Sequence, residues 1–329
     1  MRGYPLYPLG TDCPISRQAS AHPHQIYPLQ ALLTLLPLAA VLACLLVAWG
    51  PGHHLEFATR VYGGRRELLG SQVADLLDAE HDAWFYGNLA ADLINFKGYG
   101  GHYNHCHRWT IVEEMQERAE SPSEFAFCLG YLGHLAADTI AHNHYVPYHL
   151  ARYARSKGLG HLYWEMRADR FVPESRWGLV SSLKSNRELD SLDELVNSCV
   201  PKKALSMRTN KLLFNHVLLV AERDRWRRGV DRLHALSFAP LAEGFLESFR
   251  RAAVARMCLA LEPGGLEKLA HVDTNGKLAQ GEAWARRKGV LVSIKGPKQR
   301  RTLSRRAAGI FLEGMETPPP VGNHALPHW

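Results

Sequence analysis

The sequence lacks the signatures of several large protein classes. Its six cysteines include no CxxC pair, so neither a thiolate zinc site nor a dithiol redox motif is indicated. It contains no glycine-rich dinucleotide fingerprint and no phosphate-binding loop, which argues against nicotinamide-dependent enzymes and NTPases. Internal repeats are absent, and alternating strand patterns are scarce, the best being VLVSIK at residues 290–295. These absences favour a helical protein whose functional side chains are not cysteines.

The composition is ordinary for a globular chain except for its histidines. The 329 residues allow one large domain or two small ones, and a hydrophobic share of 46% is ample for a core. The net charge of +7 agrees with an anionic partner, such as nucleic acid or a membrane surface. The 18 histidines cluster along the chain, and this clustering is more informative than the net charge.

The first 50 residues differ from the rest of the chain. Residues 1–30 are polar and contain several prolines without periodicity, so we predict that they are disordered. Residues 31–50 form an apolar, uncharged run that suits either a secretory signal or a membrane span. Cleavage after Ala48 would make Trp49 the amino terminus of a secreted or periplasmic protein. If residues 31–49 are retained, they would anchor the protein to a membrane.

Helical periodicity dominates the remainder of the chain. It predicts an all-α, multi-helix domain over residues 49–260, preceded by the signal or anchor at 31–48. A basic C-terminal region, 261–329, is predicted to be partly disordered. Within it, residues 286–306 are strongly basic and form either a solvated tail or a contact for anionic lipid headgroups or other polyanions.

One helix has clear boundary signals and carries a notable pattern. Ser121 and Glu124 predict a capping box at its start, and residues 143–147 are expected to close it. An earlier segment carries three consecutive aromatic residues, 84–86, which are either core residues or substrate contacts. They are Trp84, Phe85 and Tyr86.

Two polar stripes lie on predicted helices with mostly apolar surroundings. His134, Asp138 and His142 are spaced four apart, and so are His161 and Glu165, which places each set on one helix face. The residues around the first stripe are small or apolar, so this helix is predicted to be buried. Buried imidazoles and carboxylates are costly unless they are paired or bound to metal. The stripes therefore predict a metal site, and ligands of this type favour zinc or a similar transition metal.

Other candidate ligands also lie in apolar surroundings, and two positions have competitors. A single histidine of this kind is usually a satisfied core residue or half of a surface pair. Together with the two stripes, however, these residues strengthen the prediction of a metal site. The additional candidates are His54, Asp92, His105 or His107, and His144 as the competitor of His142.

These motifs resemble the zinc-dependent phospholipase C family, which shares its metal cluster with the fungal single-strand nucleases. The residues that carry the resemblance are Trp49 and His54 in WGPGHHLEFA, Asp92 in GNLAADL, His107 in HCHRW, HLAADTIAHN and HLYWE. They span residues 49–170. The resemblance implies an all-α bundle around a polynuclear zinc cluster of two or three ions.

The resemblance also implies a role for each ligand. One zinc would be held by Asp92, His107, His134 and Asp138, and a second by His142, His161 and Glu165. Asp138 would bridge to a third, held by His54 and by the amino and carbonyl groups of Trp49 after cleavage. Asp92 would also act as the general base. His105 and His144 remain the alternatives to His107 and His142.

The implied activity is hydrolysis of a glycerophospholipid to diacylglycerol and a phosphorylated headgroup, at a phospholipid membrane surface. Two alternatives remain. A zinc-dependent nuclease acting on single-stranded nucleic acid agrees with the short Trp49–His54 spacing and with the basic C-terminal region. A non-catalytic, zinc-stabilised helical domain tethered to a membrane is the alternative from another class.

Overall fold

The computed structural model describes residues 49–94, 106–154, 157–200, 205–214, 239–293 and 296–316. Three predictions fall outside these residues and stay predictions: the polar extension at 1–30, the apolar run that precedes Trp49, and the alternative ligand His105. Among the described residues, no helix is both long enough and apolar enough to cross a membrane.

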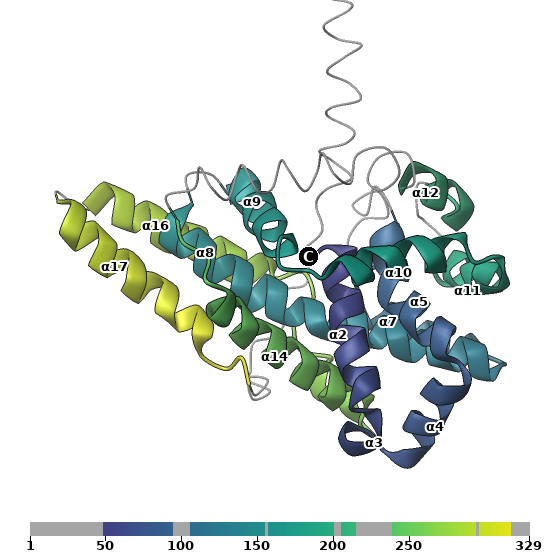
Figure 1. The fold of residues 1–329 in the computed structure, drawn as a ribbon. Helices are drawn as coiled ribbons and strands as arrows, with labels where there is room; N and C mark the ends of the chain where they lie inside the picture. Colours follow the sequence, from purple (N-terminus) through teal and green to yellow (C-terminus); the bar gives the residue numbers. More distant parts are fainter. Residues whose placement is uncertain are drawn as a thin grey trace, which may run out of the picture. The chain divides into compact units, whose positions relative to one another are not determined.

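The described residues are helical, and no strand occurs among them, which confirms the all-α prediction (Figure 1). The helices are α2 (Pro51–Gly63), α3 (Arg65–Leu68), α4 (Ser71–Ala79), α5 (His81–Leu93), α6 (Trp109–Arg118), α7 (Pro122–Ile140), η2 (Ala141–Tyr145), α8 (Val146–Tyr153), α9 (Lys157–Asp169), α10 (Glu174–Ser185), η3 (Arg187–Leu189), α11 (Asp190–Cys199), α12 (Met207–Phe214), α14 (Glu243–Leu261), α15 (Gly265–Leu269), α16 (Lys277–Ser293), α17 (Pro297–Gly309) and η5 (Ile310–Leu312).

Helix α7 begins as predicted and is buried along most of its length. The Ser121 side chain accepts a hydrogen bond from the Glu124 backbone, and the Glu124 carboxylate accepts one from the Ser121 backbone, which completes a capping box. From Ala126 onward almost every residue of α7 is buried. The two candidate ligands of this helix, His134 and Asp138, are therefore shielded from bulk water, which cannot solvate their polar atoms.

Helices α5 and α7 cross in close contact because each has a glycine at the crossing point. A Cβ atom added to Gly87 would lie 2.1 Å from the Phe127 carbonyl oxygen, and one added to Gly130 would lie 2.3 Å from the Trp84 carbonyl oxygen. Both obstacles are backbone atoms, which cannot rotate away. The close approach brings Asp92 of α5 toward the ligands of α7.

Gly130→Ala is expected to lower the free energy of unfolding by about 1–3 kcal/mol, because the added methyl group forces the two helices apart. Thermal unfolding followed by circular dichroism measures the effect. Gly178→Ala is the matched control: Gly178 lies inside α10 with nothing within 4 Å of the added Cβ. This control is expected to be neutral or slightly stabilising, because alanine has the better helix propensity. Equal melting temperatures for the two variants would contradict the crossing-point interpretation.

The helical path does not end where the sequence predicted. Residues 143–147 were expected to close the α7 helix, but the chain continues through the π-helical turn η2 directly into α8. Pro147 has no N–H to donate, and it lies at the start of α8, which follows the π-helical turn directly, where the helical hydrogen-bond pattern changes. The residues that suggested a helix end therefore mark a change from α-helix to π-helix within a continuing helical path.

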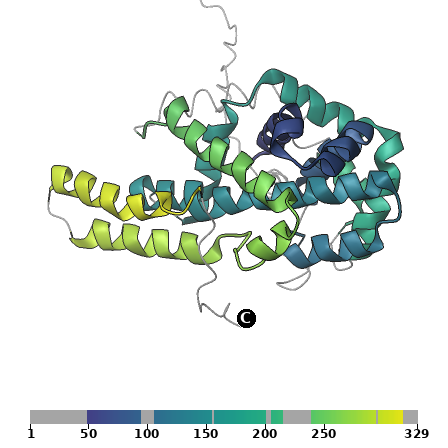
Figure 2. The same cartoon turned by 90° about the horizontal axis from the view of Figure 1, so that it is seen from below.

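The C-terminal part of the described chain packs on the same core. Helix α14 packs against α7, and α16 and α17 pack against α8 (Figures 1 and 2). The strand-like alternation in residues 290–295 does not form a strand in its described part, because α16 is helical through Ser293. The contacts of α16 with α8 and η2 stabilise the helix in spite of this local pattern.

Candidate metal centre

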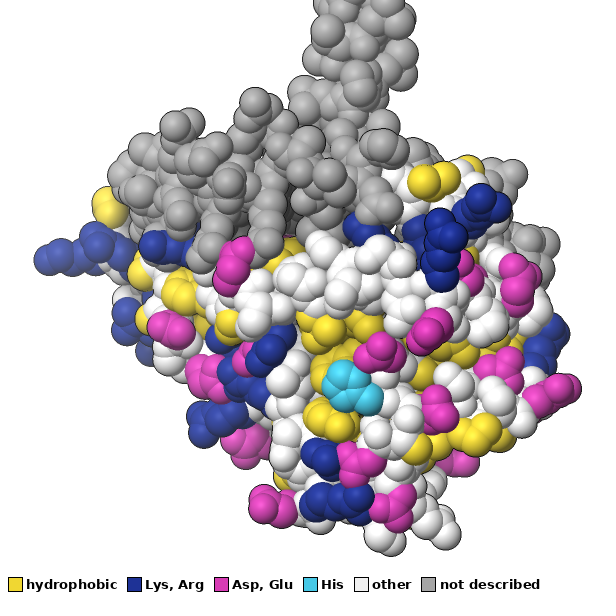
Figure 3. Space-filling model, turned by 45° about the vertical axis from the view of Figure 1, so that its right-hand side comes forward, with side chains coloured by type: hydrophobic (Ala, Val, Ile, Leu, Met, Phe, Trp, Pro, Cys, Tyr) yellow, Lys and Arg dark blue, Asp and Glu magenta, His cyan; other side chains and the backbone are white. Residues whose placement is uncertain are grey.

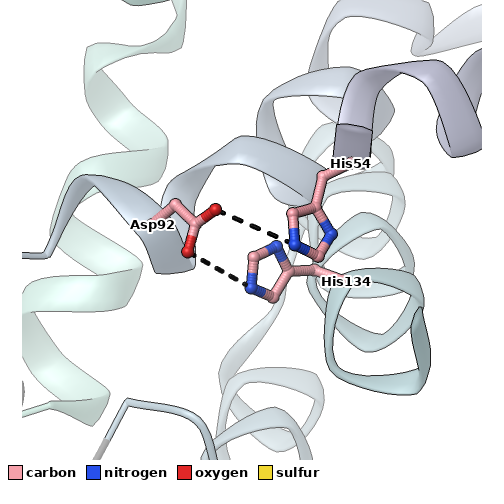
Figure 4. A group of neighbouring side chains, drawn as sticks. All are labelled: His54, Asp92 and His134. Carbon is pink, nitrogen blue, oxygen red and sulfur yellow. Dashed lines mark ion pairs between the residues drawn. The ribbon is translucent and has the colours of Figure 1, made fainter. Parts of the chain in front are cut away.

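Three helices bring together the first group of ligands. His54 of α2, Asp92 of α5 and His134 of α7 are buried, and their side chains converge (Figure 4). The Asp92 Oδ2 atom lies 3.8 Å from His54 Nε2, and its Oδ1 atom lies 3.7 Å from His134 Nε2. The two imidazole rings stack with centroids 3.7 Å apart. One ligand atom from each of the three residues lies within 4.8 Å of the others, so the group could hold a metal ion.

Asp138 lies between the imidazoles of His54, His107 and His134, and its two oxygens face different histidines. Its Oδ1 atom is 3.3 Å from His54 Nε2. Its Oδ2 atom is 3.3 Å from His107 Nε2 and 3.4 Å from His134 Nε2. His107, His134 and Asp138 form a second group whose ligand atoms lie within 4.8 Å of one another. Asp138 therefore offers one oxygen toward His54 and the other toward His107 and His134.

Neighbouring polar atoms orient two of the histidines. His134 Nδ1 lies 2.9 Å from the Asn88 carbonyl oxygen, so its Nδ1–H donates there and the Nε2 lone pair faces the cluster. His107 precedes α6, and its Nδ1 atom lies 3.2 Å from Cys106 Sγ. The Nε2 atoms of His107 and His134 converge to 3.1 Å. The structure thus brings His107 into the site.

The predicted ligands His142, His161 and Glu165 lie next to this group. His142 Nε2 is 4.0 Å from Asp138 Oδ2, and the His142 and His161 ring centroids are 5.4 Å apart. His161 Nε2 is in direct contact with Glu165 Oε1. His144 instead points to the end of the described chain, where its Nδ1–H donates to the Phe311 carbonyl oxygen at 2.9 Å. In this structure His142, rather than His144, completes the stripe.

Burial and neighbouring charges set the protonation of the ligands. Burial alone would raise the pKa of Asp138, but His134, His107 and His54 together hold that pKa well below its usual value. Burial and the nearby His54 lower the pKa of His134 to about 4, so this imidazole is neutral at physiological pH. A carboxylate and a neutral imidazole are the forms that bind metal. Burial raises the pKa of Glu165 to about 7.

The residues present fit bound zinc. Both nitrogens of His54, both carboxylate oxygens of Asp138 and Glu165 Oε2 are buried and make no hydrogen bond among the described residues, apart from the ion-pair contacts given above. So many unsatisfied polar atoms in one place are costly, because each has lost its contact with water. Imidazole and carboxylate are the nitrogen and oxygen ligands that zinc accepts. A bound metal would therefore satisfy the atoms that the protein leaves without partners.

Sequence reasoning missed one residue that contacts two of the ligands. Gln280 of α16 is buried, and its Oε1 atom accepts a hydrogen bond from His161 Nδ1 at 2.9 Å. Its Nε2 atom donates to the Asn275 carbonyl oxygen at 3.0 Å and lies 3.3 Å from His142 Nδ1. No local pattern identifies such a glutamine, because it is 119 positions from His161 in the chain.

The segment before α16 also contacts the ligand histidines. The Thr274 hydroxyl donates to the His107 carbonyl oxygen. Gly276, at φ +57°, lies against the His142 backbone, where an added Cβ would be 2.1 Å from the carbonyl oxygen. These contacts place part of the C-terminal region beside the metal centre.

The remaining predicted site residues are buried in the core. Trp49 stacks on Tyr145, with centroids 4.9 Å apart. The Trp84 indole N–H donates to the Ala58 carbonyl oxygen at 3.3 Å, and the Tyr86 hydroxyl donates to Asp193. Phe85 is 3% exposed. For the three consecutive aromatic residues, these contacts agree with the interpretation as core residues.

The fold and the site define an all-helical protein with buried groups of histidine and carboxylate side chains that could hold metal. The family model for zinc-dependent phospholipase C matches residues 53–218, about half of the chain, and the chain belongs to this family. The family is one of zinc-dependent hydrolases, which agrees with the ligand types found here. No curated protein and no solved structure matches the chain.

Proposed function

We propose that this protein is a phospholipase C that hydrolyses a glycerophospholipid to diacylglycerol and a phosphorylated headgroup, using two or three zinc ions. The observation that carries the proposal is the arrangement of the two carboxylates among the three imidazoles. Asp92 and Asp138 each direct one oxygen toward His54 and the other toward the pair His107 and His134. This arrangement suits adjacent metal ions, which phosphodiester hydrolases use to bind both sides of the reacting phosphate.

The protein side chains have separate tasks in the proposed reaction. Zinc, when bound, offsets the charge of the phosphodiester and lowers the pKa of a water. Asp138 would serve as a zinc ligand, with one oxygen facing His54 and the other facing His107 and His134. Asp92, 4% exposed, would bind zinc through one oxygen and accept the proton of the attacking water at the other, as general base. Asn88 fixes the His134 ring through its carbonyl oxygen, so that this ligand does not have to reorient during the reaction.

The test is a substrate comparison on the full chain loaded with zinc. We expect diacylglycerol from phospholipid in mixed micelles, and little release of nucleotides from single-stranded DNA. A zinc chelator is expected to stop the reaction, and added zinc to restore it. Release of nucleotides without diacylglycerol would assign the nuclease function instead. If the protein is fully loaded with zinc but hydrolyses neither substrate, the non-catalytic alternative, a zinc-stabilised helical domain, would be favoured.

The proposed substrate places the protein at a phospholipid membrane. We propose that it is secreted or periplasmic, and that it stays attached to the membrane where residues 31–49 are retained. The uncharged apolar run before Trp49 supports this proposal. Amino-terminal sequencing of the mature protein tests it: a start at Trp49 shows cleavage after Ala48, and a retained run shows anchoring.

A further inference from the structure

Helices α16 and α17 form an ordered hairpin in place of a solvated tail. They lie side by side in both ribbon views (Figures 1 and 2). Ala283 and Val290 of α16 are buried, as are Ser304 and Ala308 of α17. Arg287 holds the hairpin to the core, since its guanidinium donates to the Ala154 carbonyl oxygen at 3.0 Å and to Ser304 Oγ at 2.9 Å.

The hairpin carries a concentrated positive charge. Residues 286–306 contain no aspartate or glutamate. Lys298, Arg301 and Arg305 are exposed and follow an i, i+3, i+7 spacing, which places them on one side of α17. On the face drawn in Figure 3, acidic and basic side chains are interspersed over much of the described surface. Within residues 286–306, the basic side chains that the structure describes are Arg286, Arg287, Lys288, Lys298, Arg300, Arg301, Arg305 and Arg306.

The same hairpin exposes large apolar side chains. Val292, near the end of α16, is 88% exposed, and its neighbour Leu291 is 37% exposed. Leu278 and Leu303 of the hairpin are also exposed, so four of the seven exposed large hydrophobic residues of the described chain lie on these two helices. Single exposed hydrophobic residues need no explanation, but their concentration beside a basic surface is characteristic of proteins that bind membrane interfaces.

We infer that the α16–α17 hairpin docks on an anionic phospholipid surface. Its exposed Lys298, Arg301 and Arg305 contact the headgroups, and Leu291 and Val292 insert at the boundary of the acyl chains. A nucleic acid would satisfy the charge but would leave the apolar end of α16 in water. The combination of charge and exposed apolar side chains therefore favours a lipid surface.

The inference rests on the proposed function, and it connects the surface to the metal centre. Helix α16 contains both Gln280, which contacts His142 and His161, and Val292. Positions 280 and 292 are 12 residues apart, which corresponds to about 18 Å along a helix. One rigid element thus links the lipid-binding end to two of the candidate zinc ligands.

Vesicle binding by the zinc-loaded full chain tests the inference. We expect tighter binding to phosphatidylcholine vesicles that contain phosphatidylserine than to vesicles without it, and weaker binding at high salt. The triple variant Lys298→Glu, Arg301→Glu, Arg305→Glu is expected to bind anionic vesicles about 100-fold more weakly. Val292→Ala is expected to weaken binding about tenfold. Hydrolysis of a soluble short-chain phospholipid and zinc content should not change in either variant.

Matched controls come from exposed residues outside the hairpin. Arg251→Glu on α14 and Leu68→Ala on α3 are expected to leave vesicle binding unchanged. The inference is overturned if the triple variant binds as tightly as the unmodified chain, or if Val292→Ala has no effect while single-stranded DNA binds more tightly than vesicles. Binding to anionic vesicles without hydrolysis of any phospholipid would instead reject the proposed function and support the docking surface.

Discussion

Asp138→Ala is expected to remove most of the bound zinc and to lower phosphodiesterase activity on the order of 1,000-fold or more. The physical reason is the position of this carboxylate between three imidazoles. It is 0% exposed, and its oxygens lie 3.3 Å from His54 Nε2, 3.3 Å from His107 Nε2 and 3.4 Å from His134 Nε2. Without it, neighbouring ions would repel each other with no shared anion between them. Metal analysis of the purified variant and a diacylglycerol assay measure the two effects.

A matched carboxylate elsewhere in the core separates loss of metal from loss of fold. Asp193 is 5% exposed and pairs with Lys211 Nζ at 2.7 Å, away from the histidine cluster. Asp193→Asn is expected to destabilise the protein, because it leaves the Lys211 ammonium with a weaker partner, while zinc content stays unchanged. If Asp138→Ala retained its full zinc and activity, the bridging geometry would have no functional role.

Gln280→Ala is expected to weaken zinc binding about 10- to 100-fold at the ion nearest His161. The carboxamide cannot be reversed without cost, because its Nε2–H donates to the Asn275 carbonyl oxygen at 3.0 Å. Its Oε1 atom is therefore held toward His161, whose Nδ1–H donates to it at 2.9 Å. This hydrogen bond fixes the His161 ring with Nε2 on the side of Glu165. Competition with a chromophoric chelator measures the affinity, and metal analysis reports how many ions remain.

Two further variants distinguish positioning of the ligand from general packing. Gln280→Glu keeps an acceptor for His161 but loses the donor to Asn275, so we expect an affinity between those of the alanine variant and the unmodified chain. Gln299→Ala changes an exposed glutamine of α17 and should leave affinity unchanged. A Gln280→Ala protein with a lowered melting temperature but unaltered zinc affinity would show that Gln280 only packs α16 against the core.

Local spacing was sufficient for part of the site. Residues four apart on a helix share a face whatever the tertiary structure, so His134 and Asp138 had to point the same way, as did His161 and Glu165. The apolar residues around His134 likewise required burial of that helix. The capping box at Ser121 follows the same logic, because all its atoms lie within four residues.

The choice between neighbouring histidines depended on details of the backbone that spacing does not encode. His142 and His144 both lie in the π-helical turn η2, where the angular step per residue differs from that of an α-helix. The structure turns His142 toward Asp138 and His161, and it turns His144 toward the Phe311 carbonyl oxygen. That carbonyl is 167 positions away in the chain.

The sequence by itself determined that this protein is all-helical and that histidines and carboxylates share buried helix faces, because helix periodicity and the cost of burying polar groups act locally. Only the tertiary structure decided which helices meet. The glycine crossing of α5 and α7 brings Asp92 to His134, and the docking of α16 brings Gln280 to His161. Such contacts join positions far apart in the chain, and their pairing follows from how whole helix surfaces fit together.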